Sequence, residues 1–425
     1  MEYNTIKGEC VHRKQYFEKL LKLKDKQLIK VVTGVRRCEK STLLEMFRDY
    51  LLTNGVDESR VIALNFEEVQ NEHILHNSIK HVIFICKIYI VNIRNKRYLI
   101  MIVLKKPKIG EQINLLTDIQ IEFIKSDRSK INVADFDYLD LKKSVEEDSS
   151  FPKEIIFEWE AQEDGILQIS ESENFDNFFQ EIGKSSVKIT NLKSGTRYYW
   201  RVVCANEISD IFYFDTANTY PRFIKIDGLT NVRDCGGWKT ISGKYIKQGQ
   251  LYRGSEMNSH LSISDDGLNT MKNVLKIKSI LDLRGQNEEV KDVYQGLYKN
   301  IPAYPYGTWF NHPEIAREIF EFVLNTENYP LYFHCWGGAD RTGTLSFMLG
   351  AILGQSYKDL FDDYEITSLS IWGARSRNSE GHFKPLLNMF NEFNGETTQE
   401  KAENYLISCG VSKMLIKNFQ EFMLD

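Results

Sequence analysis

The chain has 425 residues, of which 42% are hydrophobic and 27% are charged. At about 150 residues per domain, this length predicts two or three domains, and the composition excludes a wholly disordered chain. The 54 Lys and Arg residues and the 59 Asp and Glu residues give a net charge of −5, so no overall basic field exists to bind nucleic acid. The seven cysteines are scattered and form no CxxC pair, which excludes a disulfide scaffold and a zinc-finger pattern and favours a reducing compartment.

The amino-terminal segment, residues 1–72, begins with charged residues and lacks the pattern of a signal peptide, so we expect a cytoplasmic protein. Residues 27–33 predict a buried strand, residues 34–42 (GVRRCEKST) follow it, and an amphipathic helix reaches Leu51. This order resembles the P-loop of AAA-type bacterial ATPases, which carry GxRRxGKST. Glu39 stands where that pattern requires glycine, and it adds bulk and negative charge beside a polyphosphate.

The next predicted strand, Val61–Phe66, is not followed by an apolar strand that ends in the acidic residues of a magnesium site. We therefore predict that residues 1–72 form a truncated, degenerate P-loop fragment with an α/β fold and no catalysis. A working ATPase is the alternative, and it requires that Glu39 be tolerated.

Residues 73–106 form a basic, apolar junction with two apolar runs, Val82–Ile93 and Tyr98–Leu104. As one membrane helix they would bury charged residues, each at a cost of about 2.5–3.5 kcal/mol, and neither run reaches the ~18 residues that a span requires. Their Ile and Val content predicts a β-hairpin that turns at Asn92–Arg97. Contact with a membrane is the less favoured alternative.

The middle segment, residues 107–217, predicts an all-β sandwich of short alternating strands. The clearest strands are Glu154–Trp159, Ile166–Ile169, Val187–Ile189, Tyr198–Val203 and Ile211–Phe214. Residues 192–202 (LKSGTRYYWRV) resemble the tyrosine corner of fibronectin type III domains. The resemblance implies that the Tyr198 hydroxyl bonds to the backbone near Leu192, and that this segment is a spacer or an interaction module.

The stretch that predicts chemistry is residues 334–343 (HCWGGADRTG), between a predicted buried strand, Leu331–Phe333, and a predicted buried helix, Thr344–Leu353. Cys335 precedes a helix N-terminus, which favours its thiolate. Six residues later, the planar guanidinium of Arg341 can bind two phosphoryl oxygens.

We expect the amides of the intervening loop to face inward as an anion site, since its glycines permit that curvature. The loop residues expected to bind substrate are Trp336, Gly337, Gly338 and Ala339.

This loop resembles the HCxxGxDRTG loop of cysteine-dependent tyrosine phosphatases. The resemblance implies in-line attack by Cys335, a phosphocysteine intermediate and its hydrolysis by water, without a metal or another cofactor. Thr342 is then expected to hydrogen-bond the sulfur, and His334 to orient the Cys335 backbone. In many dual-specificity phosphatases the general acid is an Asp from a loop roughly 30 residues before the cysteine, but the corresponding residues 301–313 contain no acid. The resemblance to the bacterial tyrosine/serine and lipid phosphatase branch, which carries an Asp in the loop itself, therefore implies Asp340 as the general acid, with Glu314 as the fallback.

The resemblance to the bacterial tyrosine/serine and lipid phosphatase branch extends over residues 218–425, and it implies a central mixed sheet flanked by helices. The motifs that carry it are NVRDCGG at 231–237, LYRGS at 251–255 and DLR at 282–284, followed by Glu288. We expect their charged residues to form buried pairs that brace the loop. The amphipathic segments expected to cover the sheet are Tyr357–Leu369, Lys384–Phe393, Gln399–Ser408 and Ser412–Met423.

Ala339 stands where lipid-active members of that branch often carry Lys, so phosphotyrosine is favoured over phosphoinositides as the substrate. The expected partner is thus a phosphotyrosine-containing protein or a small phosphomonoester. A catalytically silent phosphopeptide-binding module is the alternative from another class. The sequence does not determine the oligomeric state.

Overall fold

The computed structural model describes residues 17–18, 21, 40–54, 61–64, 88–91, 102–128, 148–161, 163–204, 207–285, 293–380 and 383–425. It divides the chain into two compact units, residues 1–99 and residues 100–425. In the first unit, α2 (Lys40–Thr53) buries Phe47 and Leu51 against Phe17 and Leu21. The strand β1 (Val61–Leu64) pairs antiparallel with β2 (Ile88–Val91).

Residues 34–39 of the predicted P-loop lie outside the described residues, and residues 40–42 begin α2. The strand β1 falls within the predicted strand 61–66. The described parts of the predicted hairpin do not pair with each other, because β2 pairs with β1 and β3 (Val103–Lys106) pairs with β5 (Ile155–Glu160). An alternating pattern identifies a strand but not its partner, and the β3 pairing moves the start of the sandwich ahead of residue 107.

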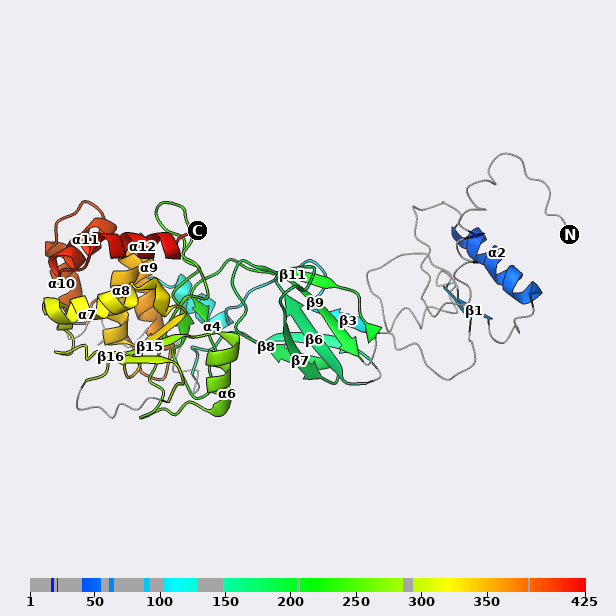
Figure 1. Cartoon of the computed structure of the whole chain (residues 1–425), viewed down its shortest axis with the longest axis horizontal. Helices are drawn as coiled ribbons and strands as arrows, with labels where there is room; N and C mark the ends of the chain where they lie inside the picture. Colours follow the sequence, from blue (N-terminus) through cyan, green and yellow to red (C-terminus); the bar gives the residue numbers. More distant parts are fainter. Residues whose placement is uncertain are drawn as a thin grey trace. The chain divides into compact units, whose positions relative to one another are not determined.

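Residues 102–216 contain a sandwich of two sheets (Figure 1). One sheet has the order β3-β5-β8, and the other has the order β4-β11-β9-β6-β7 with β10 paired to β9. Alternate residues of β9 are buried, and the Trp200 ring meets the Phe157 ring of the facing sheet edge-on at 5.2 Å between centroids. The remaining bounds are β4 (Glu111–Ile113), β6 (Gly165–Ser170), β7 (Phe179–Gly183), β8 (Ser186–Ile189), β9 (Arg197–Cys204), β10 (Glu207–Ile208) and β11 (Phe212–Thr216).

The Tyr198 hydroxyl accepts a hydrogen bond from the Lys193 amide at 2.8 Å. This bond joins β9 to the turn that precedes it, as the tyrosine-corner sequence predicts. Burial raises the pKa of Tyr198, so its hydroxyl stays neutral. The assignment to the fibronectin type III class itself stays a prediction.

The second half of the larger unit is built on a mixed six-stranded sheet of order β12-β13-β14-β17-β15-β16. The strands β14, β17, β15 and β16 are mutually parallel, and β12 and β13 are antiparallel additions. Their bounds are β12 (Arg222–Phe223), β13 (Arg233–Asp234), β14 (Leu251–Gly254), β15 (Ser279–Asp282), β16 (Leu297–Asn300) and β17 (Leu331–His334).

Helices cover this sheet on both faces (Figure 1). Leu331 and Phe333 of β17 face the core shared with the helices from α7 onward, and Tyr332 faces the smaller core that α6 and η4 cover. This alternation buries both faces of the strand, as expected for a central parallel strand. The helices are α6 (Asp265–Asn269), η4 (Thr270–Val274), η5 (Trp309–Asn311), α7 (Pro313–Val323), η6 (Thr326–Asn328), α8 (Asp340–Ile352), α9 (Tyr357–Glu365), η7 (Ile366–Leu369), α10 (Lys384–Glu392), α11 (Thr398–Ser408) and α12 (Lys413–Met423).

A helix that the sequence did not predict, α4 (Asp118–Lys125), lies between strands β4 and β5 of the sandwich. Its Phe123 packs with Phe223 and Ile366 of the sheet-and-helix region, not with the sandwich core. Arg128, three residues beyond α4, is buried and pairs with acidic residues of α9. The range 107–217 is therefore not all-β, because an excursion from the sandwich completes the neighbouring core.

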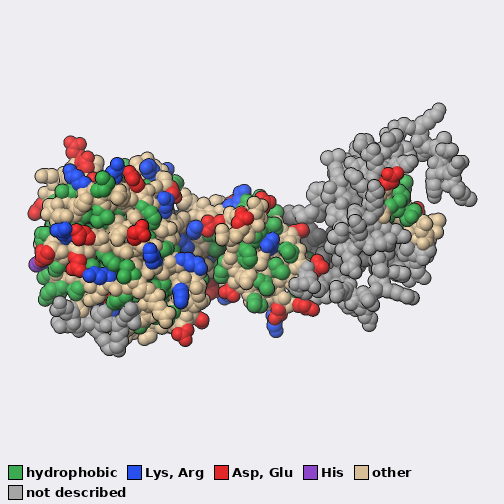
Figure 2. Space-filling view, viewed as in Figure 1, with side chains coloured by type: hydrophobic (Ala, Val, Ile, Leu, Met, Phe, Trp, Pro, Cys, Tyr) green, Lys and Arg blue, Asp and Glu red, His purple; other side chains and the backbone are tan. Residues whose placement is uncertain are grey.

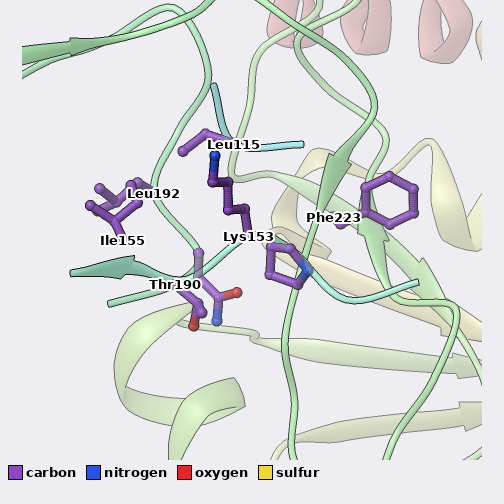
Figure 3. Close-up of a pocket in the computed structure, with 8 residues that line it drawn as sticks. Leu115, Lys153, Ile155, Thr190, Leu192 and Phe223 are labelled. Atoms are coloured by element: carbon purple, nitrogen blue, oxygen red, sulfur yellow. The ribbon is translucent and has the colours of Figure 1, made fainter. Parts of the chain in front are cut away.

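In the described parts of the chain, no helix has the length and apolar character needed to cross a membrane. On the face shown in Figure 2, acidic and basic side chains of the larger unit are interspersed. A pocket lies where the sandwich meets the mixed-sheet region, lined by Leu115, Lys153, Ile155, Thr190, Leu192 and Phe223 among others (Figure 3). Because no residue of the Cys335 loop lines this pocket, we assign it no role.

Candidate active site

The Cys335 loop connects the central strand β17 to the buried helix α8. The helix begins at Asp340, four residues earlier than predicted, so Arg341 and Thr342 lie in its first turn. Ala339 is the N-cap and offers no side chain to bond the first amides of α8. A helix start of this kind presents free N–H groups and a partial positive charge to an anion.

Steric constraints require glycine at two positions of this loop. Gly338 has a φ of +64°, and a Cβ there would lie 2.2 Å from the carbonyl oxygen of Gly254. A Cβ on Gly337 would lie 2.7 Å from Cγ of Trp372. Both positions therefore exclude a side chain, and Gly338 also needs the left-handed conformation that glycine adopts readily.

Neighbouring residues donate to the carbonyl groups of the loop from outside. The Glu256 amide donates to the Trp336 carbonyl at 2.7 Å, and Asn231 Nδ2 donates to the Gly337 carbonyl at 2.9 Å. Arg253 Nη2 donates to the Gly338 carbonyl at 2.7 Å. Because the N–H and C=O of a peptide group point in opposite directions, the loop amides are left to face the other side, as expected for an anion site.

A buried charge cluster holds Arg253 in place below the loop. The Asp363 carboxylate pairs with Arg253 at 2.6 Å and with Arg233 at 2.7 Å. Burial alone would raise the pKa of Asp363, but the charges of Arg233 and Arg253 and the hydrogen bonds from Arg233 and Ser346 hold it well below its usual value. Burial and repulsion from Arg253 lower the pKa of Arg233 to about 10. Two cations paired with one anion leave a net positive charge on the side of the loop that Arg253 contacts, and this charge favours binding of an anion on the opposite side.

The predicted nucleophile, Cys335, is 3% exposed at the start of the loop. His334 Nδ1 lies 2.9 Å from the Cys335 carbonyl oxygen, and since a carbonyl only accepts, Nδ1 carries the proton. Burial lowers the pKa of His334, although the charge of Asp282 opposes this shift. A neutral histidine bonded to the backbone orients Cys335, as the sequence predicted.

The other two predicted loop side chains are also buried. The guanidinium of Arg341 lies 5.4 Å from the centroid of the Tyr306 ring, and its Nη1 donates to the Leu283 carbonyl at 3.4 Å. The Thr342 hydroxyl is fully buried and has no hydrogen-bond partner among the described residues. Such a hydroxyl is costly unless a ligand or a reacting group satisfies it.

Asp340 is surrounded by three side chains that the sequence analysis missed. Arg375 Nε donates to Asp340 Oδ1 at 2.9 Å, and the hydroxyls of Tyr306 and Tyr364 donate to its carboxylate at 2.5 and 2.8 Å. These residues lie 24 to 35 positions away in sequence, and no local pattern marks them. Glu314, the fallback acid, lies in the first turn of α7 with its side chain 72% exposed, 3.6 Å from His312.

Aromatic side chains surround the Cys335 loop. Trp336 is 38% exposed, and its ring meets the His260 ring edge-on at 4.0 Å between centroids. Tyr306 is 46% exposed and contacts Asp340, while Trp372 packs against Gly337. Trp309, by contrast, is buried in the core. The loop is thus flanked by partly exposed rings.

Residues 224–424 match the model of the tyrosine phosphatase family. Among curated proteins, the chain is 26% identical over 171 residues to a "Putative tyrosine-protein phosphatase" of Cupriavidus necator, which covers 33% of this chain and 61% of that protein. It is 32% identical over 78 residues to inositol diphosphatase DSP4 of Arabidopsis thaliana, in a match that covers 18% of this chain and 37% of that protein. It is 42% identical over 60 residues to an uncharacterized protein of Haemophilus influenzae, which covers 14% and 15%.

The chain therefore spans between 15% and 61% of the lengths of these relatives. Among solved structures, the core catalytic domain of the PP-IP phosphatase SIW14 from S. cerevisiae is 21% identical, with 37% of this chain and 89% of that chain covered and a TM-score of 0.27. The family match and the loop geometry agree. Residues 224–424 have the loop and the α/β fold of a cysteine-based phosphatase. These relatives lend no support to the fibronectin type III and P-loop assignments, which stay predictions.

Proposed function

We propose that the chain hydrolyses phosphate monoesters through a phosphocysteine intermediate on Cys335. The observation that carries this proposal is the arrangement of a buried Cys335 at the end of β17, a loop whose carbonyls are bonded from outside, and Arg341 in the first turn of α8. Such a loop holds the three equatorial oxygens of a phosphoryl group while the sulfur attacks in line.

Each residue of the loop then has one part in the reaction. The Cys335 sulfur forms a bond to phosphorus as the bond to the leaving oxygen breaks, and Asp340 gives that oxygen a proton. Arg341 and the loop amides bind the phosphoryl oxygens. Thr342 donates a hydrogen bond to the sulfur, which eases its departure when water hydrolyses the phosphocysteine.

Phosphotyrosine is the substrate that we favour. The rings of Trp336, Tyr306 and Trp372 beside the loop suit an aromatic leaving group. Ala339 adds no cation to the loop for a second phosphate. A phosphotyrosine-containing protein is accordingly the proposed partner.

Inositol phosphates are the second candidate substrates. The relative named as an inositol diphosphatase favours them. A substrate with several phosphates would need cations beyond Arg341 near the loop.

The test is metal-independent hydrolysis by the full-length chain, measured with 4-nitrophenyl phosphate in the presence of EDTA. We expect turnover that vanadate inhibits and that Cys335→Ser abolishes, with Cys204→Ser as the matched control because Cys204 is a buried cysteine of β9 in the sandwich. A panel of phosphotyrosine peptides, phosphoserine peptides and inositol phosphates then ranks the substrates by kcat/KM. Tight binding of phosphopeptides without turnover would contradict the proposed hydrolysis and would indicate a catalytically silent binding module.

A further inference from the structure

The carboxylate of Asp340 is held by side chains from three other segments of the chain. Arg375 binds it with two nitrogens, Nε to Oδ1 at 2.9 Å and Nη2 to Oδ2 at 3.3 Å. Tyr306 donates to Oδ2 at 2.5 Å, and Tyr364 of α9 donates to Oδ1 at 2.8 Å. Both oxygens accept hydrogen bonds, which is the pattern that suits an ionised carboxylate.

The cations around this carboxylate also favour its ionised form. The side chains of Asp340 and Arg375 are only 7% and 19% exposed, so water screens their attraction poorly. Arg341 follows Asp340 directly in α8 and adds a second cation nearby. A thiolate on Cys335, at the other end of the loop, would instead disfavour the ionised form of Asp340 by like-charge repulsion. The geometry therefore opposes protonation of the residue that is proposed to donate a proton.

We propose that Arg375 is a positioning residue that keeps Asp340 ionised in the free protein and thereby sets the upper pH limit of catalysis. This inference rests on the proposed function. Only the fraction of molecules with a proton on Asp340 is ready to protonate the leaving oxygen. The proton moves from Asp340 to that oxygen as the S–P bond forms and the P–O bond breaks. Asp340 then regains a proton from the water that hydrolyses the phosphocysteine, so the cycle balances.

The test is the pH profile of kcat/KM for phenyl phosphate with the full-length chain. Phenolate is a poor leaving group, which makes the reaction depend on the acid. In Arg375→Gln we expect the descending limb of the profile to move upward by about 1–3 pH units, the range by which a nearby cation shifts a carboxyl group. Arg375→Lys keeps the cation and should stay close to the wild type.

A matched control is Arg377→Gln, because Arg377 lies in the same loop and pairs with Glu365. Its descending limb should coincide with that of the wild type. A profile of Arg375→Gln that superimposes on the wild-type profile overturns the proposal. If Arg375→Gln does not fold, Arg375→Met, which keeps a long side chain without its charge, takes its place and must move the limb in the same direction; an unmoved limb also overturns the proposal.

The proposal and the enzymatic function can fail separately. If the wild type hydrolyses no phosphate monoester, the proposed function fails, and the Arg375 proposal is decided by 13C NMR titration of the Asp340 carboxyl. Its signal is assigned by its absence from Asp340→Asn. We expect it to titrate at lower pH in the wild type than in Arg375→Gln. Equal titration in the two proteins refutes the role of Arg375.

Discussion

Asp363→Asn tests whether the buried charge cluster below the loop stabilises the fold and places the loop. Asp363 pairs with Arg233 and Arg253, which are both 0% exposed, and it also accepts from Ser346. An asparagine has the same shape but no charge, so the substitution leaves two guanidinium groups without a counter-ion. Breaking a buried pair in this way costs about 3–5 kcal/mol. Against a typical total of about 5–15 kcal/mol, this is a large loss.

The same substitution changes the pH dependence of stability. The folded pKa of Asp363 lies below the unfolded value, because the attraction of two arginines outweighs burial. Its contribution to stability is therefore fully present above the unfolded value, about 3.9, and is lost as the pH falls through the folded value. We expect the free energy of unfolding of the wild type to fall on acidification below about pH 4 more steeply than that of Asp363→Asn.

The assay is hydrogen exchange of the β14 and β17 amides at increasing urea, which reports on this region and not on the sandwich. Asp215→Asn is the matched control, since Asp215 also pairs with an arginine, Arg197, but on an exposed surface. We expect little change there. A loss of less than about 1 kcal/mol in Asp363→Asn would refute the argument that these buried charges depend on their partner.

Three further predictions concern the loop, its support and the sandwich. Gly338→Ala should abolish turnover, because the new Cβ would meet a backbone oxygen at 2.2 Å; Gly373→Ala, with a similar φ of +79° but open space, should keep turnover, and equal activity of the two contradicts the steric argument. Ser150→Ala removes the acceptor of the Asn231 amide (2.9 Å), so kcat should fall and the free energy of unfolding should drop by about 1–3 kcal/mol in thermal unfolding. Unchanged values would show that this contact does not support the loop. Tyr198→Phe should lower the free energy of unfolding of the sandwich by about 1–3 kcal/mol, measured as a lower urea midpoint, and should leave kcat/KM unchanged.

Features that depend on residues close in sequence were predictable. The loop residues from Cys335 to Thr342 are contiguous, so residue type and spacing predicted the strand, loop and helix that hold them, while the chemistry assigned to them stays a proposal. The four carboxy-terminal helices were also predicted to within a few residues, because their apolar periodicity is local. The predicted start of α8 at Thr344 is wrong, because Asp340 and Arg341, polar residues typical of a loop, form the first turn of the helix.

Partners that are distant in sequence were not predictable. Nothing local pairs Val103–Lys106 with β5, and nothing local sends α4 out of the sandwich to the neighbouring core. A hydrophobic period shows that a face is buried but not what covers it.

The sequence by itself pointed to Cys335 and Arg341 as the proposed nucleophile and phosphate-binding residue, and it predicted the strand–loop–helix that carries them, because an anion site of this kind is built from one continuous segment. Only the tertiary structure decided the surroundings of Asp340, the proposed acid. Arg375, Tyr306 and Tyr364 reach Asp340 from three separate segments. The protonation state of a buried carboxyl depends on which charges the fold brings within a few ångströms of it, and that is a property of packing rather than of sequence order.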